Sequence, residues 1–179
     1  SWPVYHSGNT DAPETEWLSL DSTNATQDYP IWNDTAPTSS VFSIGTDTTV
    51  NGNTLDYVTY NWHSVDGYSS FGSYEGNNNS DGSFIATGQG GGSYFFKNID
   101  AGIDWISSGK AYNPHNPTDQ VLQLAQTTAL VTATAHDVVS TGIKMRSTDS
   151  AVNAANTYIY GAWGGQPLTD GSINQSRAR

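Results

Sequence analysis

The chain of 179 residues is long enough for one domain with its own core, and 17 Asp and Glu against six Lys and Arg give it a net charge of −11. This balance disfavours nucleic acid and anionic membrane surfaces as partners, because both are bound largely through Lys and Arg. The absence of cysteine excludes disulfides, thiolate metal sites and a Cys nucleophile.

The composition is typical of strands joined by polar turns. Aromatic residues make up 12 % of the chain, 18 residues are Gly, and Ser, Thr, Asn and Asp fill much of the rest. We therefore predict an all-β fold, an antiparallel β-sandwich of jelly-roll, concanavalin-like type.

Residues 1–40 have four prolines and keep no period of 2 or 3.6 for long. This pattern predicts an irregular, extended N-terminal arm. Aromatic and leucine side chains would fix the arm on its own domain or on a neighbour, namely Trp2, Tyr5, Trp17, Leu18, Leu20, Tyr29 and Trp32.

The pattern changes at residue 41, and we expect a β-sandwich domain over residues 41–165 and a peripheral tail over 166–179. VFSIG (41–45) and LDYVTYNWHSV (55–65) predict strands, and Asn51-Gly52 between them is a hairpin signal. Both faces of the second segment are bulky, which favours a central strand with a buried or half-buried His63.

Later segments indicate more strands. A second hairpin is predicted over residues 68–88 with its tip at 77–82, and Gly90–Gly92 favours a tight turn or bulge. A helix over 119–136 is disfavoured by the Thr-rich run TTALVTATA. Five further strands are expected in GSYFFKNI (92–99), DWISS (104–108), QVLQLA (120–125), STGIKMRS (140–147) and NTYIYGAW (156–163).

The sequence shows no pattern typical of a catalytic or metal centre. The four histidines lack zinc-type spacing, and no Gly-x-Ser-x-Gly elbow occurs. The tip at 77–82 (NNNSDG) offers oxygen atoms to Ca²⁺, but its spacing is not that of a calcium loop, and a solvated turn is favoured. We expect no enzymatic activity, no cofactor and no catalytic residues.

Aromatic side chains on polar loops are the candidates for binding, because sugar rings stack on Trp and Tyr while Asn and Asp bond their hydroxyls. Periodicity does not separate such residues from core residues. The candidates for contact with a glycan or a protein partner are Trp32, Trp62, Tyr68, Tyr74, Trp105 and Tyr112, and Trp163 is a further one.

The stretch YVTYNWHSVDGYSSFGSYEGNNNSDGSFIATG (57–88) resembles a module encoded by bacteriophages and common in tail-fibre and other virion proteins. The resemblance extends over nearly the whole chain, with departures at QGGGSYFF (89–96) and GAWGGQPL (161–168). Further matching segments, in the same order, are WPVYH (2–6), PTSSVFSIG (37–45), FFKNIDAGIDW (95–105), YNPHNP (112–117) and GIKMRSTDSAVNAANTYIYGAW (142–163).

The resemblance implies a non-enzymatic structural component of the virion surface, either a tail-fibre or spike module or a capsid decoration protein. Its partners would be other virion proteins, copies of itself with three-fold symmetry favoured, and a glycan of the host surface. The alternative is a carbohydrate-binding module of a secreted or adhesive filament protein. A glycan-cleaving enzyme is the weakest of the three hypotheses.

Overall fold

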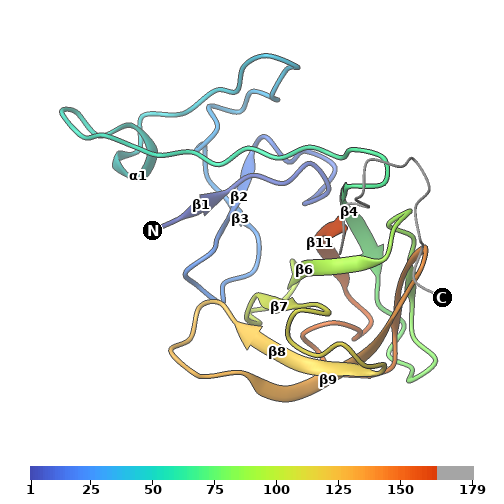
Figure 1. Ribbon diagram of the computed structural model, residues 1–179. Helices are drawn as coiled ribbons and strands as arrows, with labels where there is room; N and C mark the ends of the chain where they lie inside the picture. Colours follow the sequence, from blue (N-terminus) through green and yellow to red (C-terminus); the bar gives the residue numbers. More distant parts are fainter. Residues whose placement is uncertain (165–179) are drawn as a thin grey trace.

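A computed structural model describes residues 1–164, except for the side chain of Thr134, so the tail expected at 166–179 lies outside the described residues. The described chain is almost entirely β and antiparallel, which confirms the predicted fold class. One eight-stranded sheet curls into a nearly closed barrel, and a small three-stranded sheet packs beside it (Figure 1).

Five consecutive strands, β6 to β10, form a meander in the large sheet, and β11 inserts between β4 and β6. The order across this sheet is β4-β11-β6-β7-β8-β9-β10-β5, and every pair of neighbours is antiparallel. The strands are β4 (Ser69–Glu75), β5 (Phe84–Ile85), β6 (Gly91–Asn98), β7 (Ile106–Ser108), β8 (Thr118–Gln123), β9 (Val131–Val139), β10 (Gly142–Met145) and β11 (Thr157–Gly164).

The two edges of the large sheet are consecutive in the chain, since residues 76–83 join β4 to β5. The second hairpin predicted from the sequence is therefore wrong: β4 pairs with β11, and β5 pairs with β10. The Ser83 hydroxyl donates to the Glu75 carbonyl across this connection. Curling of the sheet brings its two edges toward each other, which limits the exposed edge.

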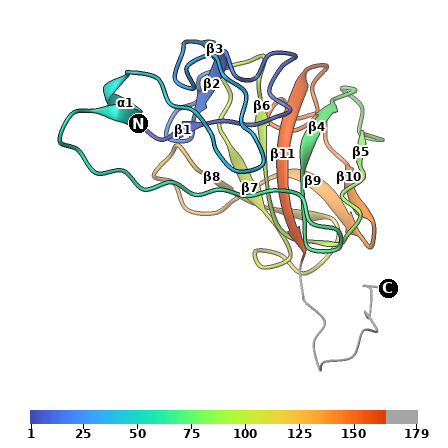
Figure 2. The same ribbon diagram turned by 90° about the horizontal axis from the view of Figure 1, so that it is seen from above.

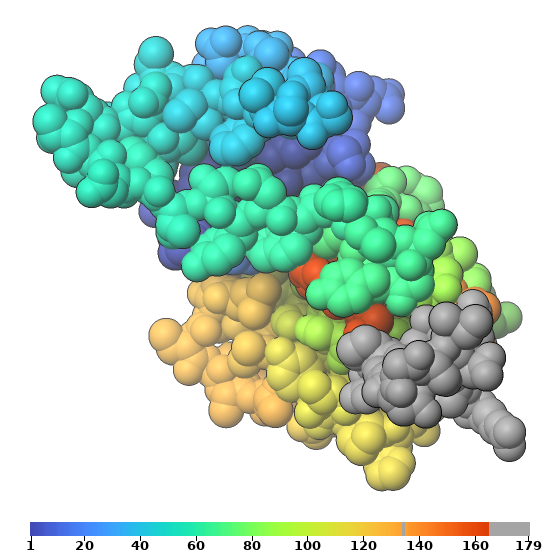
Figure 3. Space-filling view, turned by 45° about the horizontal axis from the view of Figure 1, so that its top comes forward, coloured from blue at the N-terminus to red at the C-terminus, as the bar shows by residue number. Residues whose placement is uncertain are grey.

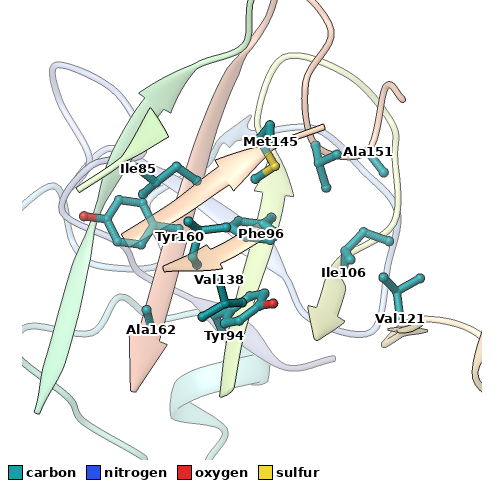
Figure 4. Packing of buried hydrophobic residues seen from close by; sticks show 12 residues of the cluster. Ile85, Tyr94, Phe96, Ile106, Val121, Val138, Met145, Ala151, Tyr160 and Ala162 are labelled. Carbon is teal, nitrogen blue, oxygen red and sulfur yellow. The ribbon is translucent and has the colours of Figure 1, made fainter. Parts of the chain in front are cut away.

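The inside of the barrel is filled by alternate side chains of the strands (Figure 4). Tyr94 and Phe96 of β6 and Tyr160 and Ala162 of β11 point inward, as the period of two in a strand requires. The other members of this cluster are Ile85, Ile106, Val121, Val138, Ile143, Met145, Ala151 and Val152.

The outer face of β6 and β11 is also buried, under the N-terminal segment. Leu18, Ile99, Trp105 and Ile159 form a second core cluster there. The N-terminal segment contains β1 (Pro3–Val4), β2 (Glu16–Ser19) and β3 (Gln27–Asp28), so the expected irregular arm is in part a small antiparallel sheet. Pairing with a neighbour outweighed the weak local pattern.

Two strands predicted from the sequence are absent from the described residues. Residues 41–45 and 55–65 form no strand, and residues 53–68 are all exposed, His63 included. The expected turn at Asn51-Gly52 is instead the end of a one-turn helix, α1 (Thr48–Asn51), whose N-cap Asp47 accepts from the Thr49 amide at 2.7 Å. Within residues 1–164 neither segment pairs with a neighbouring strand, and a strand needs such a partner.

Lys97 is buried because the N-terminal segment covers the outer face of β6. Its ammonium donates to the carbonyl oxygens of Thr23, at 3.0 Å, and of Ile103. Loss of solvent lowers the pKa of Lys97 to about 8, although the charge of Asp104 acts in the opposite direction. Lys97 thus hydrogen-bonds the N-terminal segment to the barrel.

The burial of Lys97 predicts that stability rises with pH in one window. Between pH 8 and 10.5 the unfolded chain binds the proton on Lys97 more than the folded chain does, so the free energy of unfolding increases with pH. Relative to Lys97→Met, the wild-type protein should gain on the order of 2 kcal/mol across this window. Urea titrations at a series of pH values measure it, and parallel curves for the two proteins would contradict it.

Candidate functional site

The most unusual surface of this protein is an extended segment, residues 55–64, which we call the aromatic strap. It crosses the small sheet and passes beside β11 before the chain enters β4 (Figures 2 and 3). Its large apolar side chains face solvent: Val58, Tyr60 and Trp62 are 63 %, 61 % and 60 % exposed. Monomeric soluble proteins rarely expose contiguous apolar surface of this kind without a use for it.

Both ends of the strap are held to the rest of the chain. Near its start, the Tyr57 hydroxyl donates to the Thr48 carbonyl and accepts from the Gly52 amide at 2.7 Å. At its other end, the Ser64 hydroxyl accepts from the Phe71 amide at 3.0 Å, and the Ser69 hydroxyl donates to the His63 carbonyl at 2.8 Å. The strap is therefore fixed at both ends rather than a free loop.

Between these ends the backbone is unpaired. Within the described part of the chain, residues 58–62 make no hydrogen bond through backbone or side chain. The stretch 57–64 (YVTYNWHS) also lacks Asp, Glu, Lys and Arg, in a chain whose net charge is −11. The middle of the strap thus offers free amide and carbonyl groups beside uncharged, mostly aromatic side chains.

The aromatic rings of the strap form a row with Trp2. The Tyr60 and Trp62 rings are stacked with centroids 6.0 Å apart and planes 13° apart, and Tyr60 stacks on Trp2 at 6.5 Å and 25°. The row contains the sequence-distant Trp2 because the N-terminal segment lies under the strap.

Trp163 of β11 connects this row to the core. Trp62 meets Trp163 edge to face at 5.8 Å, and Trp163 in turn contacts Phe71 at 5.4 Å and Phe95 at 5.8 Å. Phe95 then packs against buried Trp105. Gly161 makes room for these rings, since a Cβ there would lie 2.5 Å from Phe95 and 2.8 Å from Phe71.

His6 holds the N-terminal segment, and with it Trp2, against β11. Its Nδ1 accepts from the Gly8 amide at 3.0 Å, so Nε2 carries the proton and donates to the Tyr160 carbonyl at 3.1 Å. Burial lowers the pKa of His6, partly offset by the bond to Tyr160. Protonation of Nδ1 would remove the acceptor for Gly8.

Three of the candidate contact residues are packing residues. Trp32 is buried and donates from its indole nitrogen to the Glu16 carbonyl at 3.0 Å, and Trp105 does the same to the Ser19 carbonyl at 2.8 Å. The Tyr74 hydroxyl donates to the Val152 carbonyl at 2.7 Å, and burial raises the pKa of Tyr74 well above its ordinary value, with the charge of Tyr158 adding to the effect. Trp105 links the barrel to the small sheet, whereas Trp32 bonds within the N-terminal segment and Tyr74 within the barrel.

The other candidates lie at or near the surface, but only one is in the strap. Trp62 is a strap residue, and Tyr68, 57 % exposed, lies in the turn that follows. Tyr112 is half-buried in the loop between β7 and β8, with its hydroxyl 3.2 Å from that of Ser107. Trp2, Val58 and Tyr60 are absent from the candidates that the sequence offers. The alternation of Val58, Tyr60 and Trp62 is visible in the sequence, but it predicts a central strand rather than an exposed segment.

The loop at 77–82, considered for Ca²⁺, is held by hydrogen bonds of the protein. Asn77 Oδ1 accepts from the Asn79 amide at 3.1 Å and from the buried Asn153 side chain at 3.0 Å. Asp81 pairs with Lys144 at 2.9 Å, and this hydrogen bond lowers the pKa of Asp81. Among residues 1–164 no group of three or more His, Asp and Glu is arranged to hold a metal ion.

Comparison with known proteins identifies the family but no function. The chain belongs to a family described as a domain of unknown function (DUF7483), whose model matches residues 1–167. Neither the curated proteins nor the solved structures gave a match. Among residues 1–164, no helix has the length and apolar character needed to cross a membrane.

The His6 contacts predict a loss of stability in acid. Because the folded protein holds this histidine below its ordinary pKa of 6.5, the unfolded chain takes up its proton first, and the free energy of unfolding falls as the pH drops through 6.5. From about pH 7.5 to about pH 5, His6→Gln should lose less stability than the wild-type protein does. Denaturant titrations measure this, with His115→Gln at an exposed position as the matched control; equal losses in the two variants would contradict it.

Proposed function

We propose that this protein is a non-enzymatic structural component of a bacteriophage virion surface, in a tail fibre or spike or as a capsid decoration protein. In this role the barrel is a stable support, and the aromatic strap is its contact surface. The proposal also includes other virion proteins as partners.

The observation on which the proposal rests is the aromatic strap itself. Val58, Tyr60 and Trp62 expose apolar surface on a segment whose backbone is unpaired between fixed ends. A contact surface of this kind suits assembly, because burying aromatic area is favourable and free amides and carbonyls can pair with a partner. The sequence resemblance to virion modules is the reason for proposing a phage particle as the assembly.

The test is the composition of the particle. If the proposal is right, particles purified from lysates of infected host cells should contain this chain in a fixed number of copies, detected by mass spectrometry. A strap variant, Trp62→Ser, should fold but be depleted from the particles, whereas Leu130→Ser, on an exposed loop between β8 and β9, should be incorporated normally. Purified particles that lack the wild-type chain would contradict the proposal.

Carbohydrate binding is the second candidate function, and the stacked row of Trp2, Tyr60 and Trp62 favours it. Exposed aromatic rings are the usual platform for sugar rings, and Trp2, Tyr60 and Trp62 are all more than half exposed. A host-surface glycan would then be the ligand of the same strap.

Under this second candidate, saturable binding to host polysaccharide should weaken about threefold to tenfold in Trp62→Ala, because one ring contact is lost. Tyr68→Ala is the matched control, since Tyr68 is similarly exposed but has no ring contact in the described chain. Isothermal titration with the purified polysaccharide measures the affinity. No binding by the wild-type protein would eliminate this candidate.

A further inference from the structure

We propose that the aromatic strap is a dimer interface, in which the strap of one copy pairs antiparallel with the strap of a second copy about a two-fold axis through Tyr60. The inference deepens the proposed function and rests on it only in treating the strap as a contact surface. It names the occupant of that surface as a second copy of this chain.

The backbone of the strap has the geometry that strand pairing needs. Residues 58–62 follow an extended path (Figures 1 and 2), are exposed and are free of hydrogen bonds within the described chain, while both ends of the strap are fixed. Such a segment presents free amides and carbonyls as the edge strand of a sheet does, and these match those of another extended segment. Antiparallel pairing of identical segments is self-complementary, so each copy supplies the hydrogen-bond donors and acceptors that the backbone of the other copy needs.

The side chains determine one register for this pairing. Val58, Tyr60 and Trp62 lie on the same side of the extended chain, because side chains alternate along it. The three side chains of one copy lie opposite the three of the second copy only when the two-fold axis passes through Tyr60. This register places Val58 opposite Trp62 of the second copy and Tyr60 opposite Tyr60. Pairs of a β-branched and an aromatic residue are among the stabilising cross-strand pairs.

The net charge of the protein also favours the strap as the contact surface between two copies. Two copies that each have a net charge of −11 repel one another, so they can meet closely only where their surfaces are neutral. The uncharged stretch 57–64 is such a place, and an exposed stripe of three large apolar side chains lies on it. A glycan would use the rings but would leave the backbone groups and Val58 without a matching partner.

Sedimentation equilibrium of the full chain tests the proposal. The wild-type protein should reach about twice its 19.2 kDa monomer mass as its concentration rises through the micromolar range. Val58→Asp places an acidic group opposite Trp62 and adds charge to a negative protein, so it should require a concentration at least about tenfold higher to dimerise. The matched control is Leu130→Asp, at an apolar side chain with 44 % exposure outside the strap, and it should dimerise like the wild type.

A second experiment uses the absence of cysteine. Because the chain has no other thiol, Tyr60→Cys can form a disulfide only between two copies, and the proposed axis places residue 60 opposite itself. Mild oxidation should link two copies of this variant covalently under conditions in which Leu130→Cys forms no disulfide-linked dimer. Equal cross-linking of the two variants would overturn the register.

The remaining outcomes separate this inference from the proposed function. A wild-type protein that stays monomeric at high concentration, or that binds a glycan as a monomer, overturns the dimer while leaving the particle test untouched. A three-fold assembly also overturns it, because antiparallel pairing about a two-fold axis closes at two copies. Dimers that fail to enter particles would instead contradict only the proposed function.

Discussion

The structure depends on the burial of β6 and β11 on both faces. Their inward side chains, Tyr94 and Phe96 on one strand and Tyr160 and Ala162 on the other, fill the barrel. Their outward side chains, among them Ile159 and Phe95, require a second cover, which the N-terminal segment provides through Leu18. Without that cover a large apolar face of the sheet would remain in water, and its burial is the main favourable term available to a domain without disulfides.

This double burial explains the polar groups inside the protein. Lys97 points outward from β6, but the N-terminal segment covers it, so its ammonium donates to the carbonyl of Thr23 on that segment and to that of Ile103 between β6 and β7. His6 likewise bonds to the carbonyl of Tyr160 on β11. The small sheet is therefore held to the barrel by hydrogen bonds that were formed at the cost of desolvation, as well as by apolar contact.

The same arrangement produces the exposed surface. The N-terminal segment occupies the outer face of the sheet, so the strap lies across the outside of that segment. There Tyr60 contacts Trp2, and Trp62 contacts Trp163. A continuous series of ring contacts then runs from the surface to buried Trp105. These ring contacts and the hydrogen bonds at its two ends hold the strap in place before any partner binds.

Much of the architecture follows from the local sequence. The strands β6, β7, β8, β10 and β11 overlap segments predicted as strands, and β9 overlaps the Thr-rich run in which a helix is disfavoured. Short runs of β-branched and aromatic residues favour extended backbone. Other predictions failed where a partner strand decides the outcome. Residues 16–19 pair and form a strand despite a weak pattern, whereas residues 55–65 have a strong pattern and remain unpaired.

The sequence by itself determined the all-β class, the lack of thiol chemistry and the abundance of aromatic side chains. Only the tertiary structure decided which aromatics are core and which are surface, placing Trp32 and Trp105 inside and Trp2, Tyr60 and Trp62 outside. The physical reason is that extended backbone is a local preference of the residues, whereas burial depends on which distant segment covers a given face of the sheet.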